Sequence, residues 1–314
     1  MNDSRHKYVF GPVPSRRLGR SLGVDLVPFK TCPFDCVYCQ LGRTTLHTAR
    51  REEYASTDQV LAELAEVLGR RPECDYVTLS GSGEPTLHRD LDRIVSAVKD
   101  LTDVPLAVLT NAALLGDPDV RRALLPADLV VPSLDAGDEE TFARVNRPCP
   151  PITFPSLVDG LTAFRGEYTG RIDLEILLVA GLNDSDEQIE KIKALAARIR
   201  PDGIDLNTVT RPPAEADARP VGPERLSRIA EILGPSARII APHTPGDDRS
   251  GPVDRQELLG LLRRRPCTLD DLMAALRCHR WEAAKLLGQL TEEGVIAVRR
   301  HEDTMYYEVR KKDE

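Results

Sequence analysis

Three cysteines lie close together near the start of the chain and could bind a metal. Cys32, Cys36 and Cys39 stand at C-x3-C-x2-C spacing within the stretch 30–40. Three thiolates on one short loop can each take one iron of a cubane 4Fe-4S cluster, which leaves the fourth iron without a protein ligand. Because such an iron can bind a small molecule, the spacing predicts a cluster that does chemistry.

Zinc and disulfide roles for these cysteines are disfavoured. A structural zinc site needs a fourth ligand, usually from a second cysteine or histidine pair nearby, and the next candidates, His47 and Cys74, form no such pair. Disulfides are disfavoured because the other cysteines are scattered singly and no signal peptide precedes them. These are Cys74, Cys149, Cys267 and Cys278. Such cysteine usage predicts a reducing cytoplasm, in which a cluster can persist.

The cysteine loop resembles that of the radical S-adenosylmethionine (SAM) superfamily, because the spacing is accompanied by an aromatic residue, Tyr38, directly before the third cysteine. The resemblance implies a 4Fe-4S cluster whose open iron chelates the amino and carboxylate groups of SAM. It also implies that an electron from the cluster splits SAM to a 5'-deoxyadenosyl radical, and that Tyr38 belongs to the SAM site.

Length and charge limit the class of protein. At 314 residues the chain is long enough for one large and one small domain. No apolar run approaches the roughly 18 residues of a membrane span, so a soluble protein without membrane contact is expected. The formal net charge of -8, from 42 basic and 50 acidic residues, argues against a generally basic nucleic-acid-binding surface. It leaves a local basic patch open.

The elements that must position the cysteine loop alternate between strands and helices. Strands are predicted at 22–27, 76–80, 106–110, 129–134, 172–178 and 204–209, and helices at 56–68, 91–98, 120–125, 139–145, 156–164 and 187–199. Repeated strand–helix units imply parallel strands with right-handed crossovers. With the resemblance, the prediction is an α/β fold with a partial (β/α)6 parallel barrel of radical SAM type.

Polar residues follow the predicted strands, at the edge where parallel sheets place their chemistry. After the second strand, Gly81 and Gly83 would let the backbone approach a ligand closely. The resemblance assigns Gly83 and Glu84 to the SAM amino group. A plain turn would also use these glycines.

The next three strand ends supply further candidates for the SAM pocket. Ser133 and Asp135 can bond ribose hydroxyls. Asn111 is placed in the pocket by resemblance, although an asparagine at a strand end also closes turns. Asn183 is expected near the adenosine or methionine moiety.

Three residues are predicted on the substrate side, as catalytic candidates. Arg147 resembles a recurrent arginine of a family subgroup, while Asn207 and Arg211 follow the sixth strand. Each could instead only cap a helix or close a turn.

Arginines 16, 17 and 20 precede the cysteine loop by a few residues, in a segment (11–20) whose glycines and prolines predict a loop. They either form a solvated turn or a basic collar. Such a collar would hold an anionic substrate group or dock an acidic electron donor such as flavodoxin or ferredoxin.

Several motifs together resemble the group related to wyosine-base (tRNA imidazoG37) synthases over residues 8–215: Gly-Pro-Val-Pro-Ser-Arg-Arg at 11–17, the cysteine loop, Ser-Gly-Glu-Pro-Thr at 82–86, and Ser-Leu-Asp-Ala at 133–136 with Asn-Arg-Pro at 146–148. Those synthases build a tricyclic guanine in tRNA from pyruvate carbons, and they bind a second cluster through three further upstream cysteines. No cysteine precedes Cys32 here. We therefore expect a relative with one cluster and different chemistry.

The C-terminal region is predicted to be a separate unit, with a core domain at 1–241, a linker at 242–252 and a winged-helix-like domain at 253–314. Three helices followed by a hairpin indicate a winged helix-turn-helix, whose third helix would carry Arg280 and Lys285. Its 12 basic and 11 acidic residues over 255–314 favour contact with protein, or presentation of a substrate, over DNA binding. RNA binding stays open, and Cys278 and His279 are expected to be packing residues.

Two functions from different classes follow. The first is a radical SAM enzyme acting on an unidentified substrate, with tRNA or a protein among the candidates. The second is a nucleic-acid-binding regulator that senses redox state through its cluster. The polar residues at successive strand ends favour the enzyme, because a sensor needs no SAM pocket.

Overall fold

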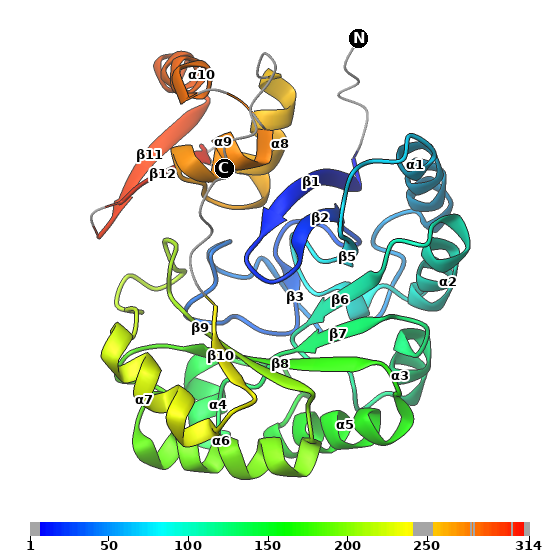
Figure 1. The fold of residues 1–314 in the computed structure, drawn as a ribbon, viewed down its shortest axis with the longest axis vertical. Coiled ribbons are helices and arrows are strands. Elements are labelled where there is room, and N and C mark those ends of the chain that lie inside the picture. The colour runs from blue at the N-terminus through cyan, green and yellow to red at the C-terminus, as the bar shows by residue number, and fades with distance from the viewer. Residues whose placement is uncertain (1–6, 241–253, 277, 279, 303, 311–314) are drawn as a thin grey trace.

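The structure is a computed structural model of the chain, and it describes residues 7–240, 254–276, 278, 280–302 and 304–310. The described residues form a larger unit around one sheet and a smaller C-terminal unit (Figure 1). The predicted linker at 242–252 and His279 lie outside the described residues. The predicted domain boundaries therefore stay predictions.

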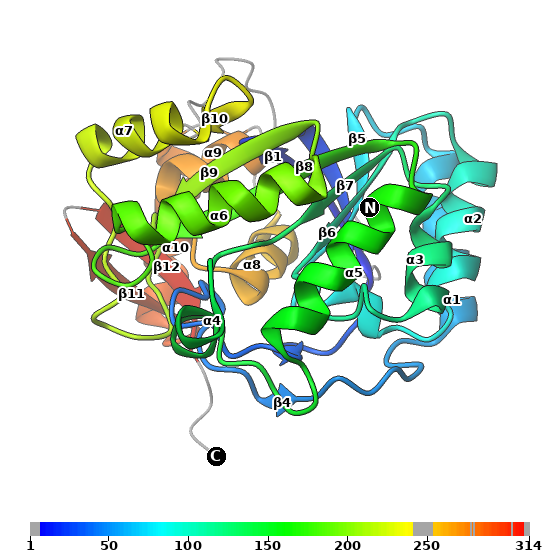
Figure 2. The same ribbon diagram turned by 90° about the horizontal axis from the view of Figure 1, so that it is seen from below.

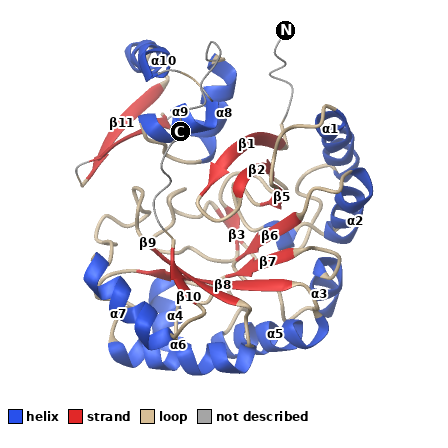
Figure 3. Cartoon of the chain, viewed as in Figure 1, coloured by secondary structure: helices blue, strands red, loops and turns tan. Residues whose placement is uncertain are grey.

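An eight-stranded sheet forms the framework of the larger unit, in the order β1-β2-β5-β6-β7-β8-β9-β10. Its strands are β1 Val9–Ser15, β2 Gly19–Val24, β5 Tyr76–Leu79, β6 Leu106–Thr110, β7 Leu129–Pro132, β8 Arg171–Leu178, β9 Gly203–Thr208 and β10 Ala237–Ile239. Neighbouring strands are parallel except for the antiparallel pair β1 and β2. Figure 3 shows the strands enclosed by helices. The predicted α/β fold with a partial parallel barrel is confirmed.

Helices cover the outer face of the sheet, with α1, α2 and α3 at one side and α6 and α7 at the other (Figure 2). Their bounds are α1 Thr57–Gly69, α2 Leu91–Leu101, α3 Pro118–Leu124, α4 Glu139–Val145, α5 Phe154–Glu167, α6 Asp186–Ile199 and α7 Pro223–Leu233. Hydroxyl or carboxylate side chains cap the first turns of α3, α4, α5 and α6: Asp117, Asp138, Thr153 and Ser185. Across the described ranges, no helix is long and apolar enough to cross a membrane.

The loop predicted over 11–20 is wrong, because most of this segment belongs to a β-hairpin. β1 pairs with β2 alone and is an edge strand, so Pro12 and Pro14 can occupy it without breaking a central ladder. Gly23 permits the pairing, since a Cβ there would lie 2.1 Å from a ring carbon of Phe10. The prolines therefore mark an edge strand, where the sequence predicted a loop.

A helix and a strand follow the last predicted strand, and the strand extends the sheet. α7 begins with Pro223 and buries Leu226, Ile229 and Leu233 at helical spacing. β10 then pairs in parallel with β9. With three residues and an exposed Ile239, β10 lacks the apolar pattern by which the longer strands are recognised.

The C-terminal unit has the predicted element order of three helices and a hairpin, and its assignment to the winged-helix class stays a prediction. Its elements are α8 Arg255–Arg264, α9 Leu269–Leu276, α10 Arg280–Glu292, β11 Ile296–His301 and β12 Thr304–Val309. Thr268 caps α9, accepting from the Asp271 backbone N–H at 3.0 Å. The unit packs on the barrel, with α9 against β1 and the Tyr306 hydroxyl donating to the Thr210 carbonyl.

Alanine substitutions at the two ends of α2 test the layer packing. Leu91 is fully buried, so Leu91→Ala should lower the free energy of unfolding by about 2–5 kcal/mol through the cavity it leaves. Leu101 on the same helix is 42% exposed, and Leu101→Ala should cost less than about 1 kcal/mol. Urea denaturation followed by circular dichroism measures both. Equal losses would contradict the described face of α2.

Candidate functional site

The cysteine loop is held on one side by a short parallel ladder and by the end of β5. The ladder pairs β3 (Thr31–Cys32) with β4 (Leu46–His47). The Lys30 backbone N–H donates to the Ser82 carbonyl at 2.6 Å, and the Glu84 N–H donates to the Thr31 carbonyl at 3.1 Å. The loop therefore starts at a fixed position beside the carboxyl end of the sheet.

The other side of the loop is held by the segment that follows α4. The Val37 N–H donates to the Val145 carbonyl at 3.0 Å, and the Cys149 N–H donates to the Pro33 carbonyl at 2.8 Å. Phe34 forms an antiparallel bridge with Pro148, and its ring meets Phe142 of α4 edge-on at 5.3 Å. Two distant segments thus clamp the loop.

Each cysteine thiol of the loop receives a hydrogen bond from a different nitrogen-bearing side chain. Asn111, directly after β6, donates its amide to Cys32 Sγ at 3.3 Å. Asn146, directly after α4, donates to Cys36 Sγ at 3.6 Å. Lys30, which is 2% exposed, donates its ammonium to Cys39 Sγ at 3.2 Å. Such donors stabilise thiolates and tune the iron they bind.

Burial makes the thiols of Cys32 and Cys36 poor acids on their own. It raises the pKa of Cys36 to about 12, with Asp135 and Cys39 adding to the effect, and it raises the pKa of Cys32 well above its usual value. Thiolates in such a place need a cation, and metal binding supplies one by displacing the protons. The donor set therefore suits an iron–sulfur group.

The sequence spacing of the three cysteines is that of a cluster loop. Among the described residues, no group of three or more His, Cys, Asp or Glu side chains is close enough to hold one metal ion. A cubane takes each thiolate on a different iron, so its ligands lie farther apart than those of one ion. None of the seven cysteines forms a disulfide. The half-buried ones are Cys32, Cys36, Cys39 and Cys74, and the buried ones are Cys149, Cys267 and Cys278.

Glu84 is buried and fixes the ends of β5 and β6 to each other. Its Oε1 accepts from the Thr86 and Thr110 hydroxyls at 2.6 and 2.7 Å, and its Oε2 accepts from the Asn111 N–H at 2.7 Å. Burial raises the pKa of Glu84, and these donors oppose that shift. Glu84 thus positions Asn111, which in turn donates to Cys32.

The glycines after β5 lie against other parts of the chain. A Cβ on Gly83 would lie 2.0 Å from the Thr31 carbonyl oxygen, and one on Gly81 would lie 2.5 Å from Asp25 Cγ. Gly83 is needed because the β5 end packs directly on the backbone of the cysteine loop. Its predicted contact with SAM stays a prediction.

Tyr38 and Asp135 are brought together as the sequence predicts for one pocket, but they bond to each other. The Tyr38 hydroxyl and the Asn146 amide both donate to Asp135 Oδ2, the latter at 2.8 Å, and the Leu177 N–H donates to Oδ1 at 2.8 Å. Burial raises the pKa of Asp135 to about 6. Asp135 therefore ties the cysteine loop, α4 and β8 together.

Asn183 is fully buried and its amide is hydrogen-bonded inside the chain, and its expected place near the adenosine or methionine moiety stays a prediction. Its Oδ1 accepts from the Val179 N–H at 2.7 Å, and its Nδ2 donates to the carbonyls of Asp135 and Leu177 at 2.7 and 2.8 Å. Ser133 is half-buried at the end of β7. No hydrogen bond within the described ranges engages its hydroxyl, which leaves it free for a ligand.

The three predicted catalytic residues are distributed around the site. Arg147, at the end of α4, pairs with Glu215 at 2.5 Å. Asn207 accepts from Arg16 Nη1 at 3.2 Å. Arg211 donates to Gln40 Oε1 at 3.4 Å, which places it beside the cysteine loop.

The proposed basic collar is divided by the structure. Arg16 and Arg17 reach β9 and β8, where Arg17 pairs with Glu175 at 2.6 Å. Arg20 turns to the segment before β5, donating to the Glu73 carbonyl at 3.0 Å. Arg20 therefore does not join the other two.

Lys30 and Asn146 were not among the predicted site residues. Asn146 stands in the Asn-Arg-Pro motif, so its place next to Arg147 was a usable signal. Lys30 offered only its position two residues before Cys32. Lys30 and Asn146 reach the cysteine thiols through hydrogen bonds that only the folded chain brings about.

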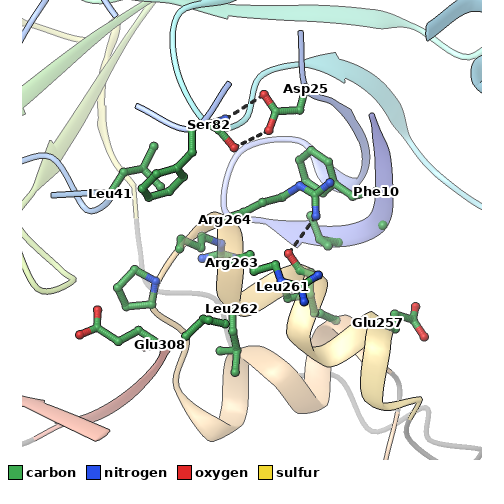
Figure 4. A pocket seen from close by; sticks show the side chains of 18 of the residues that line it. Phe10, Asp25, Leu41, Ser82, Glu257, Leu261, Leu262, Arg263, Arg264 and Glu308 are labelled. Atoms are coloured by element: carbon green, nitrogen blue, oxygen red, sulfur yellow. Dashed lines mark hydrogen bonds between the residues drawn. The ribbon is translucent and has the colours of Figure 1, made fainter. Parts of the chain in front are cut away.

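A cavity of about 1500 Å³ lies between the barrel and the C-terminal unit, beside the cysteine loop. Residues 40–42 of the loop, Asp25 and Ser82 line it from the barrel, and α8 lines it from the other side (Figure 4). The Arg264 guanidinium stacks over the Phe10 ring at 4.2 Å and joins the two walls. The cavity gives a substrate room next to the loop.

Comparisons with known proteins agree with this geometry. The family model described as "Radical SAM superfamily" matches residues 26–196. A "UPF0026 protein" of Methanocaldococcus jannaschii is 37% identical over 226 residues, which are 71% of this chain and 70% of that protein. A solved radical SAM methyltransferase from Sphaerobacter thermophilus has a TM-score of 0.53 at 18% identity, covering 70% of this chain and 65% of that one. The solved structure shows similarity of fold.

A longer relative also matches. "GTPase Obg" of Brachyspira hyodysenteriae is 36% identical over 296 residues, which are 92% of this chain. The chain spans 43% of the length of that relative. The name GTPase is that of the relative.

Adding one methyl group at Gly83 tests the contact between the end of β5 and the cysteine loop. Gly83→Ala should push the end of β5 and the Thr31 backbone apart, because a Cβ 2.0 Å from the Thr31 carbonyl oxygen cannot be accommodated without a backbone shift. We expect a lower melting temperature and at least a twofold loss of iron bound after anaerobic reconstitution. Gly166→Ala, where nothing lies within 4 Å of the new Cβ, is the control. Unchanged iron content in Gly83→Ala would contradict the contact.

Proposed function

The chain belongs to the radical SAM superfamily, and from this we propose that it is an enzyme that cleaves SAM reductively at a 4Fe-4S cluster held by Cys32, Cys36 and Cys39. The observation that supports it most is the cysteine loop itself. Three half-buried thiols each have their own hydrogen-bond donor, at the edge where the parallel strands end. When bound, the cluster supplies the electron that splits SAM into methionine and a 5'-deoxyadenosyl radical, which abstracts hydrogen from a substrate.

The chain's own residues would hold and orient these groups. Asn111, Asn146 and Lys30 donate to the three thiols and would stabilise them as cluster ligands. The unengaged hydroxyl of Ser133 is suited to a ribose hydroxyl. Tyr38 and Asp135, already bonded to each other, would form a fixed wall of the SAM pocket.

Gly83 and Glu84 would contribute to SAM binding through the conformation of the segment that contains them. Thr31 fills the space beside Gly83, and the Glu84 carboxylate is hydrogen-bonded within the chain. Arg147, Asn207 and Arg211 are proposed on the substrate side. Arg211 has the strongest support, because it lies between the cysteine loop and the C-terminal unit.

The finer assignments are also proposals. The motifs over 8–215 favour a relative of wyosine-base synthases that lacks the second cluster. We propose a flavodoxin or ferredoxin as electron donor, a cytoplasmic location, and tRNA or a protein as a substrate presented by the C-terminal unit. The curated relatives matched over most of this chain leave the reaction open.

A redox-sensing regulator is the second candidate, favoured by the C-terminal unit of three helices and a hairpin. In Figure 1 its α10 lies at the end of the unit away from the barrel, as a contact helix would. Near-equal basic and acidic counts over 255–314 weigh against it.

A SAM cleavage assay separates the two functions. Anaerobically reconstituted protein with dithionite and SAM should form 5'-deoxyadenosine and methionine, detected by liquid chromatography with mass spectrometry. Cys36→Ala should lose the cluster absorbance and at least 99% of the product, because one iron of the cluster loses its ligand. The control Cys74→Ala, at a half-buried position before β5, should keep both. A full cluster that binds SAM but yields neither product would contradict the proposed enzyme.

A further inference from the structure

Four arginines gather where the β1–β2 turn, the segment after β9 and the end of α8 meet. Arg16 and Arg17 come from the turn, Arg211 follows β9 and Arg265 follows α8. Arg16 Nη1 donates to the Thr210 hydroxyl at 3.4 Å, one residue before Arg211. Burial lowers the pKa of Arg16 to about 10, with the charges of Arg211, Arg17 and Arg265 adding to the effect. We call these four side chains the arginine cluster.

The arginine cluster has fewer carboxylates than guanidinium groups. Glu175 pairs with Arg17 at 2.6 Å, and Asp271 pairs with Arg211 at 3.3 Å. In the described part of the chain, Arg16 donates hydrogen bonds to neutral oxygens only, those of Asn207 and Thr210. Within the described ranges, no hydrogen bond or ion pair engages the Arg265 guanidinium. Four guanidinium groups thus share two carboxylates, so the cluster has an excess of two positive charges.

One donor of the cluster is buried without an acceptor. Arg211 Nε is inaccessible to water and has no hydrogen-bond partner in the described part of the chain. Burial lowers the pKa of Arg211, and Arg265 contributes to the shift. A buried, unpaired guanidinium nitrogen is costly. Such a group is relieved when an anion supplies the missing acceptor.

One member of the arginine cluster, Arg265, lines the interdomain cavity near the cysteine loop. Arg211 Nη1 donates to Gln40, the residue after Cys39. Gln40 and Arg265 both line the cavity of about 1500 Å³. Of the Asp, Glu, Lys and Arg residues that line this cavity, seven are basic and four are acidic, although the chain as a whole carries -8. The local charge therefore favours entry of an anion.

We propose that the arginine cluster binds a phosphate group of the substrate and so holds the rest of that molecule in the cavity beside the cysteine loop. The inference rests on the proposed function and names the substrate class for the same site. A phosphate monoester carries about -1.5 to -2 charges at pH 7, which matches the excess of two positive charges in the arginine cluster. Guanidinium groups also bind phosphate oxygens through paired N–H donors.

Titration of the full-length protein with inorganic phosphate tests the proposal, with isothermal calorimetry at low ionic strength as the readout. We expect saturable binding, and a loss of at least threefold in affinity for Arg211→Gln and for Arg265→Gln. Arg122→Gln on α3, an exposed arginine paired with Asp119, is the matched control and should bind as the parent does. Acetate, with one charge, should bind at least threefold more weakly than phosphate.

Further measurements show whether a loss of affinity comes from the arginine side chain or from unfolding, and which kind of phosphate compound binds. Arg211→Lys keeps the charge and should recover part of the affinity, and melting temperatures show whether Arg211→Gln is folded. Tighter binding of glucose 6-phosphate or of a 5'-phosphorylated RNA trinucleotide than of phosphate supports the proposal and identifies the source of the phosphate. The proposal is wrong if the protein shows no saturable phosphate binding. It is also wrong if Arg211→Gln or Arg265→Gln binds phosphate with an affinity within threefold of the parent's. Because SAM cleavage is measured separately, its persistence would show that the proposed function stands when this site fails.

Discussion

The rest of the structure depends on how the three thiols of the cysteine loop are shielded from water while they stay accessible to a metal. The cysteine loop is clamped between the end of β5 and the segment after α4, through backbone bonds from Glu84 to Thr31 and from Val37 to Val145. Buried thiolates without donors or a cation would be unstable, so each thiol receives one N–H donor. Two of these donors follow the end of an element, Asn111 after β6 and Asn146 after α4. The cysteine loop therefore has these two hydrogen bonds only when the barrel is formed.

The polar residues at the strand ends mostly join one element to the next. Glu84 fastens β5 to β6, and Asp135 fastens the cysteine loop to β8 while Asn183 holds the turn after it. This bonding fixes the site in advance, so that a ligand would meet groups already in position. It also explains why Ser133, whose hydroxyl is unengaged in the described structure, is the clearest candidate for a direct contact.

Much of the fold was predictable because buried parallel strands and amphipathic helices leave regular patterns. β6 and α4 have the predicted bounds, 106–110 and 139–145. β1 was missed because its prolines are signals for loops as well as for edge strands. In the site, residue types near the strand ends were predictable, but the direction of each side chain was not. Gly83 was expected to face a ligand and meets Thr31, and Lys30 reaches Cys39 only because the loop folds back.

The distribution of charge inside the barrel explains how an acidic chain can still offer an anion site. Asp173 and Asp205 lie on one face of β8 and β9, and Arg238 pairs with both, at 2.9 and 2.6 Å. Glu175 on the same face is matched by Arg17. Each of these carboxylates has an arginine partner close by, so they leave the excess positive charge of the arginine cluster in place. Because a low-dielectric interior screens charge weakly, this excess charge would act strongly on an anion that reaches the cluster. A substrate with a phosphate group would therefore be oriented before any radical chemistry begins.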